Sequence, residues 1–284
     1  MSLPSVTGID HYIIRVNDLA GAAAAYGRLG FFVSPEGRHH KGTRNHTIIL
    51  DANYLELLYF PPELKAGSRF ASFPDHYEGP VAAALQTTDS VAVHRELAAL
   101  GINAPEPQSG GRPVSFDGVA GNAAWVNTEF PADAAPLPLF FTCGHQTREL
   151  VFRPQWQDHP NTARRLGALL IAHPNPLALL PTYERLFGAI SVSHGADWLE
   201  VRRGTLRLRF STPSKLQHDY PGVLVPDALN GGWFAGSVVE VRDLSRATRL
   251  LDENGIRHQA AVDGQRVVSL GETYGTLLAF SQET

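Results

Sequence analysis

The chain has 284 residues, of which 43% are hydrophobic and 18% are charged, and its formal net charge is −4. This composition is typical of a globular protein, and the length predicts two domains that can each bury a core. Lys and Arg are scattered, no signal peptide opens the chain, and no apolar run approaches roughly 18 residues. We therefore expect neither a nucleic acid nor a membrane as a partner. The one cysteine, Cys143, excludes an internal disulfide framework and favours a reducing cytoplasm.

The first predicted strand covers residues 8–16, and a later strand covers residues 53–60. Both are rich in β-branched, aromatic or long apolar residues. His11 stands on the first strand and Glu56 lies in the middle of the second, between leucines. An ionisable group in such a strand is costly unless it is paired. We therefore expect His11 and Glu56 to face each other, as metal ligands or as an acid/base pair.

A repeat runs through the whole chain. Four predicted helices begin with an Asp or Asn and end just before a Gly, and they lie at residues 18–30, 89–101, 175–188 and 243–255. Each is followed by a strand-like run and a closing strand, at residues 54–60, 137–142, 205–210 and 275–280. The pattern predicts an α+β fold of four βαβββ modules. An unrelated α+β protein whose helices share common caps is the alternative.

The Pro-rich and polar stretch around residues 142–164 separates modules two and three. We expect a first domain at residues 1–145, a linker at 146–164, and a second domain at 165–284.

These features resemble the vicinal oxygen chelate superfamily of glyoxalases, bleomycin resistance proteins and dioxygenases. The resemblance depends on the Gly-Ile-Asp-His opening strand, the Asp-Leu turn into a helix that ends in Leu-Gly-Phe, and the Asn-Tyr-Leu-Glu-Leu closing strand. More narrowly, residues 37–45 and the His-Pro-Asn-Thr-Ala run at residues 159–163 resemble the bacterial glyoxalase-like domain family.

The resemblance implies curved mixed sheets that pair around a pocket, with ligands from the first and last strands of the modules holding one divalent cation. Its ligand positions fall on His11 and Glu56. In the other modules the corresponding positions carry no metal ligand. Counted from the helix caps, the positions that correspond to His11 are Ala82, Ala168 and Gly236. Counted along the closing strands, the positions that correspond to Glu56 are approximately Phe140, Arg207 and Leu278. Modules three and four are therefore expected to be structural or to complete the pocket, without a cluster of ionisable residues between their sheets.

A loop rich in polar residues lies between these two strands. His39, His40 or His46 could supply a third metal ligand, or all three could be solvated. Arg38, Thr43 and Asn45 offer a guanidinium, a hydroxyl and an amide, which suit the binding of a carboxylate or carbonyl substrate. The predicted substrate-binding residues are Arg38, His39, His40, Thr43 and Asn45. Cys143 beside His145 could form a thiol and base pair, which the sequence favours only weakly.

Two classes of function remain open. The first is an enzyme of the vicinal oxygen chelate type, a lyase, isomerase or dioxygenase, that acts on a small oxygen-rich metabolite through Glu56 and His11. The second is a protein that binds or sequesters a small molecule without catalysis. One divalent metal ion, of Zn, Mn, Fe, Ni or Mg, and no metal at all are both compatible with the residues. The expected partner is a small molecule, with a homodimer left open.

Overall fold

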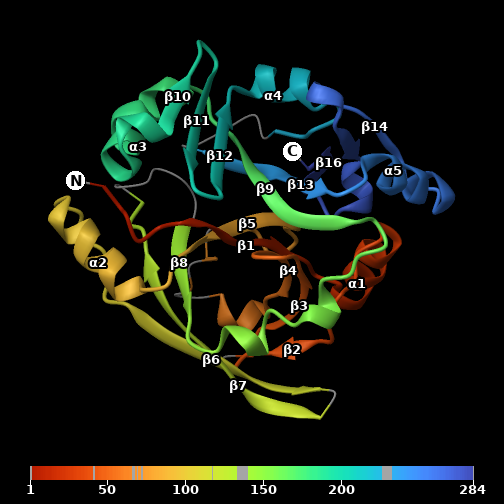
Figure 1. The fold of residues 1–284 in the computed structure, drawn as a ribbon, viewed down its shortest axis with the longest axis horizontal. Helices are drawn as coiled ribbons and strands as arrows, with labels where there is room; N and C mark the ends of the chain where they lie inside the picture. The colour runs from red at the N-terminus through yellow and green to blue at the C-terminus, as the bar shows by residue number, and fades with distance from the viewer. Residues whose placement is uncertain are drawn as a thin grey trace.

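The structure is a computed structural model that describes residues 2–40, 42–65, 68, 70–71, 73–116, 118–132, 140–225 and 232–283. Within these residues the chain forms two eight-stranded mixed sheets, with the N-terminal half in the lower part of Figure 1 and the C-terminal half in the upper part. Each sheet contains two βαβββ modules. The predicted fold class is therefore confirmed.

The elements of the four modules follow in chain order. Module one consists of β1 (Gly8–Arg15), α1 (Leu19–Arg28), β2 (Gly37–Arg38), β3 (Arg44–Ile49) and β4 (Tyr54–Tyr59). Module two consists of β5 (Gly79–Gln86), α2 (Ser90–Ala99), β6 (Gln108–Phe116), β7 (Val119–Glu129) and β8 (Phe140–His145). Module three consists of β9 (Ala163–Ala172), α3 (Leu180–Phe187), β10 (Val192–His194), β11 (Trp198–Arg203) and β12 (Leu206–Ser211). After α4 (Pro213–Asp219), module four consists of β13 (Trp233–Val241), α5 (Leu244–Glu253), β14 (His258–Ala260), β15 (Arg266–Val268) and β16 (Leu277–Gln282).

The two sheets have the same topology. The strand order is β2-β3-β4-β1-β5-β8-β7-β6 in the first and β10-β11-β12-β9-β13-β16-β15-β14 in the second. In the first sheet the opening strands β1 and β5 are antiparallel to each other, and each is parallel to the closing strand of its own module. We propose that each sheet is one domain and that the segment between β8 and β9 is the linker. Residues 137–139 of the predicted closing strand lie outside the described residues.

Three of the four predicted helix caps are formed by aspartates. The side chains of Asp18, Asp89 and Asp243 each accept a hydrogen bond from a backbone N–H three residues later, which satisfies a donor that the helix leaves free. Asn175 makes no such bond, because a 3₁₀ turn at Pro176–Leu179 precedes α3. The four glycines that were predicted to end the helices all have positive φ, from 66° to 85°: Gly30, Gly101, Gly188 and Gly255. Among the described residues, no helix is long and apolar enough to cross a membrane.

The pairing of the strands corrects the positions expected to match Glu56. In module one Glu56 pairs with Ile13, five residues before the cap Asp18. The residues five before the other caps pair with Phe141, Arg209 and Ala279. The expected positions, Phe140, Arg207 and Leu278, are therefore wrong by one or two residues, because the helix caps do not fix where a closing strand starts. None of the three corrected positions carries a carboxylate.

The two sheets share one hydrophobic core on the faces that carry the helices. The main buried cluster includes residues from all four modules, and the ring of Phe234 on β13 lies 5.7 Å from that of Tyr12 on β1. The opposite faces differ. In the second sheet, Leu216 and Tyr220, from α4 and the residue after it, pack over that face. In the first sheet the corresponding face encloses a cavity.

We expected no cluster of ionisable residues in the second half of the chain, and that expectation is wrong. Glu200 on β11 is buried and lies 3.0 Å from Arg207 on β12. Asp219 at the end of α4 lies 3.5 Å from Arg209 and 2.9 Å from Lys215. Each carboxylate is thus offset by cations, as a buried charge requires. These ion pairs connect strands to one another and to α4.

Candidate functional site

The first sheet curls until the short strand β2 lies next to β6, at the opposite edge of the sheet. The enclosed cavity has a volume of about 650 Å³, within the usual range for small-molecule sites. Most of its wall is apolar and aromatic, including Leu58, Phe60, Phe70, Trp125 and Phe141. Its polar lining residues include His11, His39, His40, Thr43, Asn45, Thr47, Glu56, Arg112, Asn127 and His145.

His11 on β1 and Glu56 on β4 both line this cavity. They are 5% and 6% exposed, and the distance from His11 Nε2 to Glu56 Oε2 is 3.7 Å. Glu56 Oε1 accepts a hydrogen bond of 2.6 Å from the side-chain amide of Asn45 on β3. The ring of Tyr54 stacks on that of His11, with centroids 4.5 Å apart. The structure therefore brings the two predicted residues together and leaves one carboxylate oxygen facing the imidazole.

Asp10 was not predicted, yet it holds His11 in place. The regular alternation of β1 is interrupted by a β-bulge in its pairing with β5. Ile9 pairs with Leu85 and His11 pairs with the adjacent Ala84, so Asp10 is the extra residue and has no paired residue on β5. The bulge lets the buried Asp10 Oδ1 accept a 2.7 Å hydrogen bond from His11 Nδ1. This bond places the Nδ1 proton on the Asp10 side and directs Nε2 toward Glu56.

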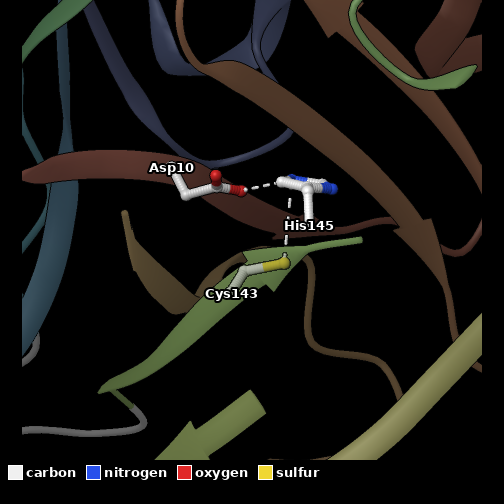
Figure 2. Close-up of side chains that lie close together, drawn as sticks. All are labelled: Asp10, Cys143 and His145. Carbon is white, nitrogen blue, oxygen red and sulfur yellow. Dashed lines mark hydrogen bonds and ion pairs between the residues drawn. The ribbon is translucent and has the colours of Figure 1, made fainter. Parts of the chain in front are cut away.

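The same carboxylate oxygen reaches the end of β8. His145 Nε2 lies 3.1 Å from Asp10 Oδ1, and Cys143 Sγ lies 3.7 Å from His145 Nε2 (Figure 2). Burial alone would raise the pKa of Asp10, but the hydrogen bonds from His11 and His145 outweigh it and lower that pKa to about 2. Asp10 is therefore an anion at neutral pH, shared by two imidazoles.

Cys143 is buried, and its surroundings make it a poor nucleophile. Burial raises the pKa of its thiol well above the usual range, and the charges of Asp10 and Glu56 add to this effect. The thiol form is unreactive, so the structure gives no support to the weakly favoured thiol and base pair.

Of the predicted loop residues, His39, His40, Thr43 and Asn45 line the cavity. His39 Nδ1 lies 2.7 Å from the Thr43 hydroxyl, and burial lowers the pKa of His39 although the charge of Glu56 opposes this.

Arg38 and His46 are not brought into the cavity. The Arg38 side chain is 73% exposed, and its guanidinium lies 2.9 Å from the carboxylate of Glu36. Successive residues of a strand point to opposite faces, and Arg38 stands on the face that points away from the cavity. His46 Nδ1 lies 2.7 Å from the carbonyl of Ser34. The guanidinium in the cavity wall belongs instead to Arg112 on β6, which was not among the predicted site residues. No local signal marks Arg112, since its place depends on the meeting of β2 and β6.

The residues fit a resident metal ion only in part. Asp10 behind His11 matches the carboxylate–histidine arrangement that supports many metal ligands. A catalytic metal usually has three protein ligands, however. Among the described His, Cys, Asp and Glu side chains, the one group of three with ligand atoms within 4.8 Å is Asp10, Cys143 and His145. In that group the thiol is protonated and Asp10 already accepts two hydrogen bonds. His11 and Glu56 thus form a two-ligand set, and we derive no chemical step through a metal.

Paired βαβββ modules that curl around one cavity define the vicinal oxygen chelate fold. Within that fold, the chain belongs to the glyoxalase-like domain family, whose family model matches residues 9–187. The match covers the first sheet and continues through β9 and α3.

Solved structures support the same fold at low sequence identity. A hypothetical protein from Staphylococcus aureus is 13% identical, with a TM-score of 0.65 over 97% of this chain and 99% of that one. A mutant of 4-hydroxymandelate synthase from Streptomyces coelicolor is 13% identical, with a TM-score of 0.59 over 98% and 93%. A 2,3-dioxygenase, LapB, from a Pseudomonas species is 12% identical, with a TM-score of 0.57 over 99% and 94%. No curated protein sequence matches the chain.

Proposed function

We propose that the first-domain cavity binds a small oxygen-rich metabolite and catalyses proton transfer at a carbon next to a carbonyl group. The observation that supports this proposal is the buried pair in the cavity wall, with His11 Nε2 and Glu56 Oε2 only 3.7 Å apart. Two of the similar structures are named as enzymes, which agrees with a catalytic role.

The two side chains have complementary roles in such a step. The Glu56 carboxylate removes the proton from the carbon, and the electron pair of the C–H bond passes into an enolate. His11, when protonated, donates its Nε2 proton to the enolate oxygen. The proton held by Glu56 then returns to a carbon of the substrate, and the enol oxygen gives its proton back to His11 Nε2 as the carbonyl forms again. Charge is conserved, and no oxidant or reductant is needed. The outcome is an isomerisation or epimerisation.

The surroundings favour this chemistry. Asn45 donates to Glu56 Oε1, so the carboxylate is oriented while Oε2 stays directed at the imidazole. Asp10 fixes the His11 ring in the same way from the other side. The apolar wall limits the water that competes for the proton.

Hydrogen–deuterium exchange tests the proposal without knowledge of the substrate. The protein is incubated in deuterated buffer with a panel of small aldehydes, ketones and oxo acids, and loss of the proton next to the carbonyl is followed by NMR. We expect catalysed exchange for a subset of the panel. Glu56→Gln should slow this exchange by about 10²- to 10⁴-fold, the usual contribution of a general base.

Glu200→Gln is the matched control, because Glu200 is a buried carboxylate in the other sheet, away from the cavity. It should leave the exchange rate unchanged. Equal rates for Glu56→Gln and the wild type on every active compound would refute the role of Glu56.

A function in binding alone is the second candidate, and the largely apolar wall favours it, since such a wall can bind a ligand without chemistry. Tight retention of a metabolite, with no exchange on any compound of the panel, would support this alternative.

A further inference from the structure

Arg112 is a buried arginine whose guanidinium has no partner among the residues that the structure describes. It is 5% exposed and lines the cavity from β6. Among the described residues, no carboxylate lies within 4.0 Å of its guanidinium and no group forms a hydrogen bond with it. Burial lowers the pKa of Arg112, while Tyr54 and Glu56 oppose this, and an arginine stays charged in proteins.

Two other buried arginines in the described part of the chain are compensated in part, although Arg15 Nε and Arg153 Nη1 lack a hydrogen-bond partner. Arg15 donates to the carbonyl oxygens of Pro74 and Asp75. The guanidinium of Arg153 lies 5.5 Å from the ring centroid of Trp156, within reach of a cation–π interaction. An isolated buried cation carries a large cost in solvation. Among the described residues, the Arg112 guanidinium has neither kind of contact.

The fold also makes room for this guanidinium. The guanidinium lies beside Gly37, which has no side chain. A Cβ atom on residue 37 would lie 2.9 Å from Arg112 Nη1 and 2.5 Å from Asn45 Oδ1. A side chain at position 37 would therefore push Arg112 away. The meeting of β2 and β6 thus keeps Arg112 next to the amide of Asn45, which itself contacts Glu56.

We propose that Arg112 binds a carboxylate group of the ligand, so that the ligand is a small carboxylic acid with an apolar body. Arginine pairs with carboxylates through two parallel hydrogen bonds, which would satisfy the unpaired guanidinium. A single cation near Glu56 suits a monoanion better than a dianionic phosphate, which Glu56 would repel. The aromatic wall of the cavity then receives the apolar body. This proposal depends on the cavity being the substrate site assigned above.

Matched pairs of ligands test this proposal directly. Small aromatic and aliphatic carboxylic acids and their primary amides are titrated into the full-length protein by calorimetry, with the matching phosphate monoesters as a third series. For the wild type we expect at least one acid to bind at least about tenfold more tightly than its amide, as a hydrogen bond to a charged group predicts. This measurement needs no variant. No preference for any acid would overturn the proposal, and tighter binding of the phosphate series would overturn its assignment to carboxylates.

Variants then test whether Arg112 causes the preference for acids over amides. Arg112→Gln should remove it, while Arg38→Gln, which changes the exposed arginine on β2, should leave it intact. Because the Arg112 guanidinium has no partner in the described part of the chain, Arg112→Gln should not lower the melting temperature, whereas loss of a structural arginine would. Arg112→Lys, which keeps the charge but not the fork of donors, should retain part of the preference.

Failure of this proposal can be told apart from failure of the proposed function. Deuterium exchange that is equally fast with neutral carbonyl compounds, and unchanged in Arg112→Gln, would reject the carboxylate while proton transfer stands. An Arg112-dependent preference for acids with no exchange on any compound would reject proton transfer while the carboxylate site stands.

Discussion

The Asp10 carboxylate gives the sharpest test of the site geometry. It is fully buried and accepts hydrogen bonds from His11 at 2.7 Å and from His145 at 3.1 Å. Burial opposes its charge, but these bonds win and lower its pKa from the ordinary 3.8 to about 2. At about 1.4 kcal/mol for each pKa unit, the anion contributes about 2 kcal/mol to the free energy of unfolding at neutral pH.

Asp10→Asn keeps the shape and removes the charge. A folded-state pKa below the unfolded value means that the stabilisation is present above about pH 4 and is lost as the pH falls through about 2. We therefore expect Asp10→Asn to lower the free energy of unfolding by about 2 kcal/mol at pH 7 and by about 1 kcal/mol at pH 3. Urea denaturation of both proteins at pH 7, 4 and 3 measures this difference.

Asp252→Asn is the control, since Asp252 is 66% exposed and its contact with His258 is expected to contribute no more than about 0.5 kcal/mol. Equal stability of Asp10→Asn and the wild type at pH 7 would refute the argument. So would a difference that stays at its full size at pH 3, because that difference could not come from the ionisation of Asp10.

Four further outcomes follow from the same contacts. Glu56→Gln should change the free energy of unfolding by less than about 1 kcal/mol in denaturant titrations, because the new amide oxygen can still accept from Asn45; a larger loss would mark Glu56 as structural. Gly37→Ala should cost about 1–3 kcal/mol and weaken the binding of acids, since its Cβ would collide with Asn45 and Arg112; an unchanged melting temperature and affinity would contradict this. Cys143→Ala should keep deuterium exchange, and a loss of exchange without a loss of stability would show that the thiol takes part. Dialysis against EDTA should leave exchange unchanged, and activity that is lost and then restored by a divalent cation would reveal a metal.

The module pattern could be predicted because it depends on local chemistry. Asp18, Asp89 and Asp243 cap their helices through bonds to residues three positions away, and glycines with positive φ end them. Both signals are visible in the sequence without knowledge of the partner strands. His11 and Glu56 were identifiable for a related reason, since each is an ionisable residue in a strand that is otherwise apolar.

The rest of the site depends on features that the sequence does not display. Asp10 neighbours His11, and strict alternation would place it on the opposite face, so only the bulge explains its contact with the imidazole. Arg112 lies 56 positions after Glu56 in the numbering and reaches the same cavity only because the edges of the sheet meet. Arg38 had the right chemistry, but it stands on the outward face of a two-residue strand.

The bulge that presents Asp10 recurs in the second sheet, where Phe234 and Gly236 pair with adjacent residues of β9 and Ala235 is the extra residue. Gly236 is the counterpart of His11, and a Cβ atom there would lie 1.9 Å from the carbonyl oxygen of Leu277. A backbone carbonyl cannot swing aside as a side chain can, so every other amino acid at this position requires β13 and β16 to separate. A single substitution of this glycine therefore cannot place a ligand side chain here without moving the two strands apart. At this position of module four, the packing of β13 against β16 thus excludes the side chain that His11 presents in module one.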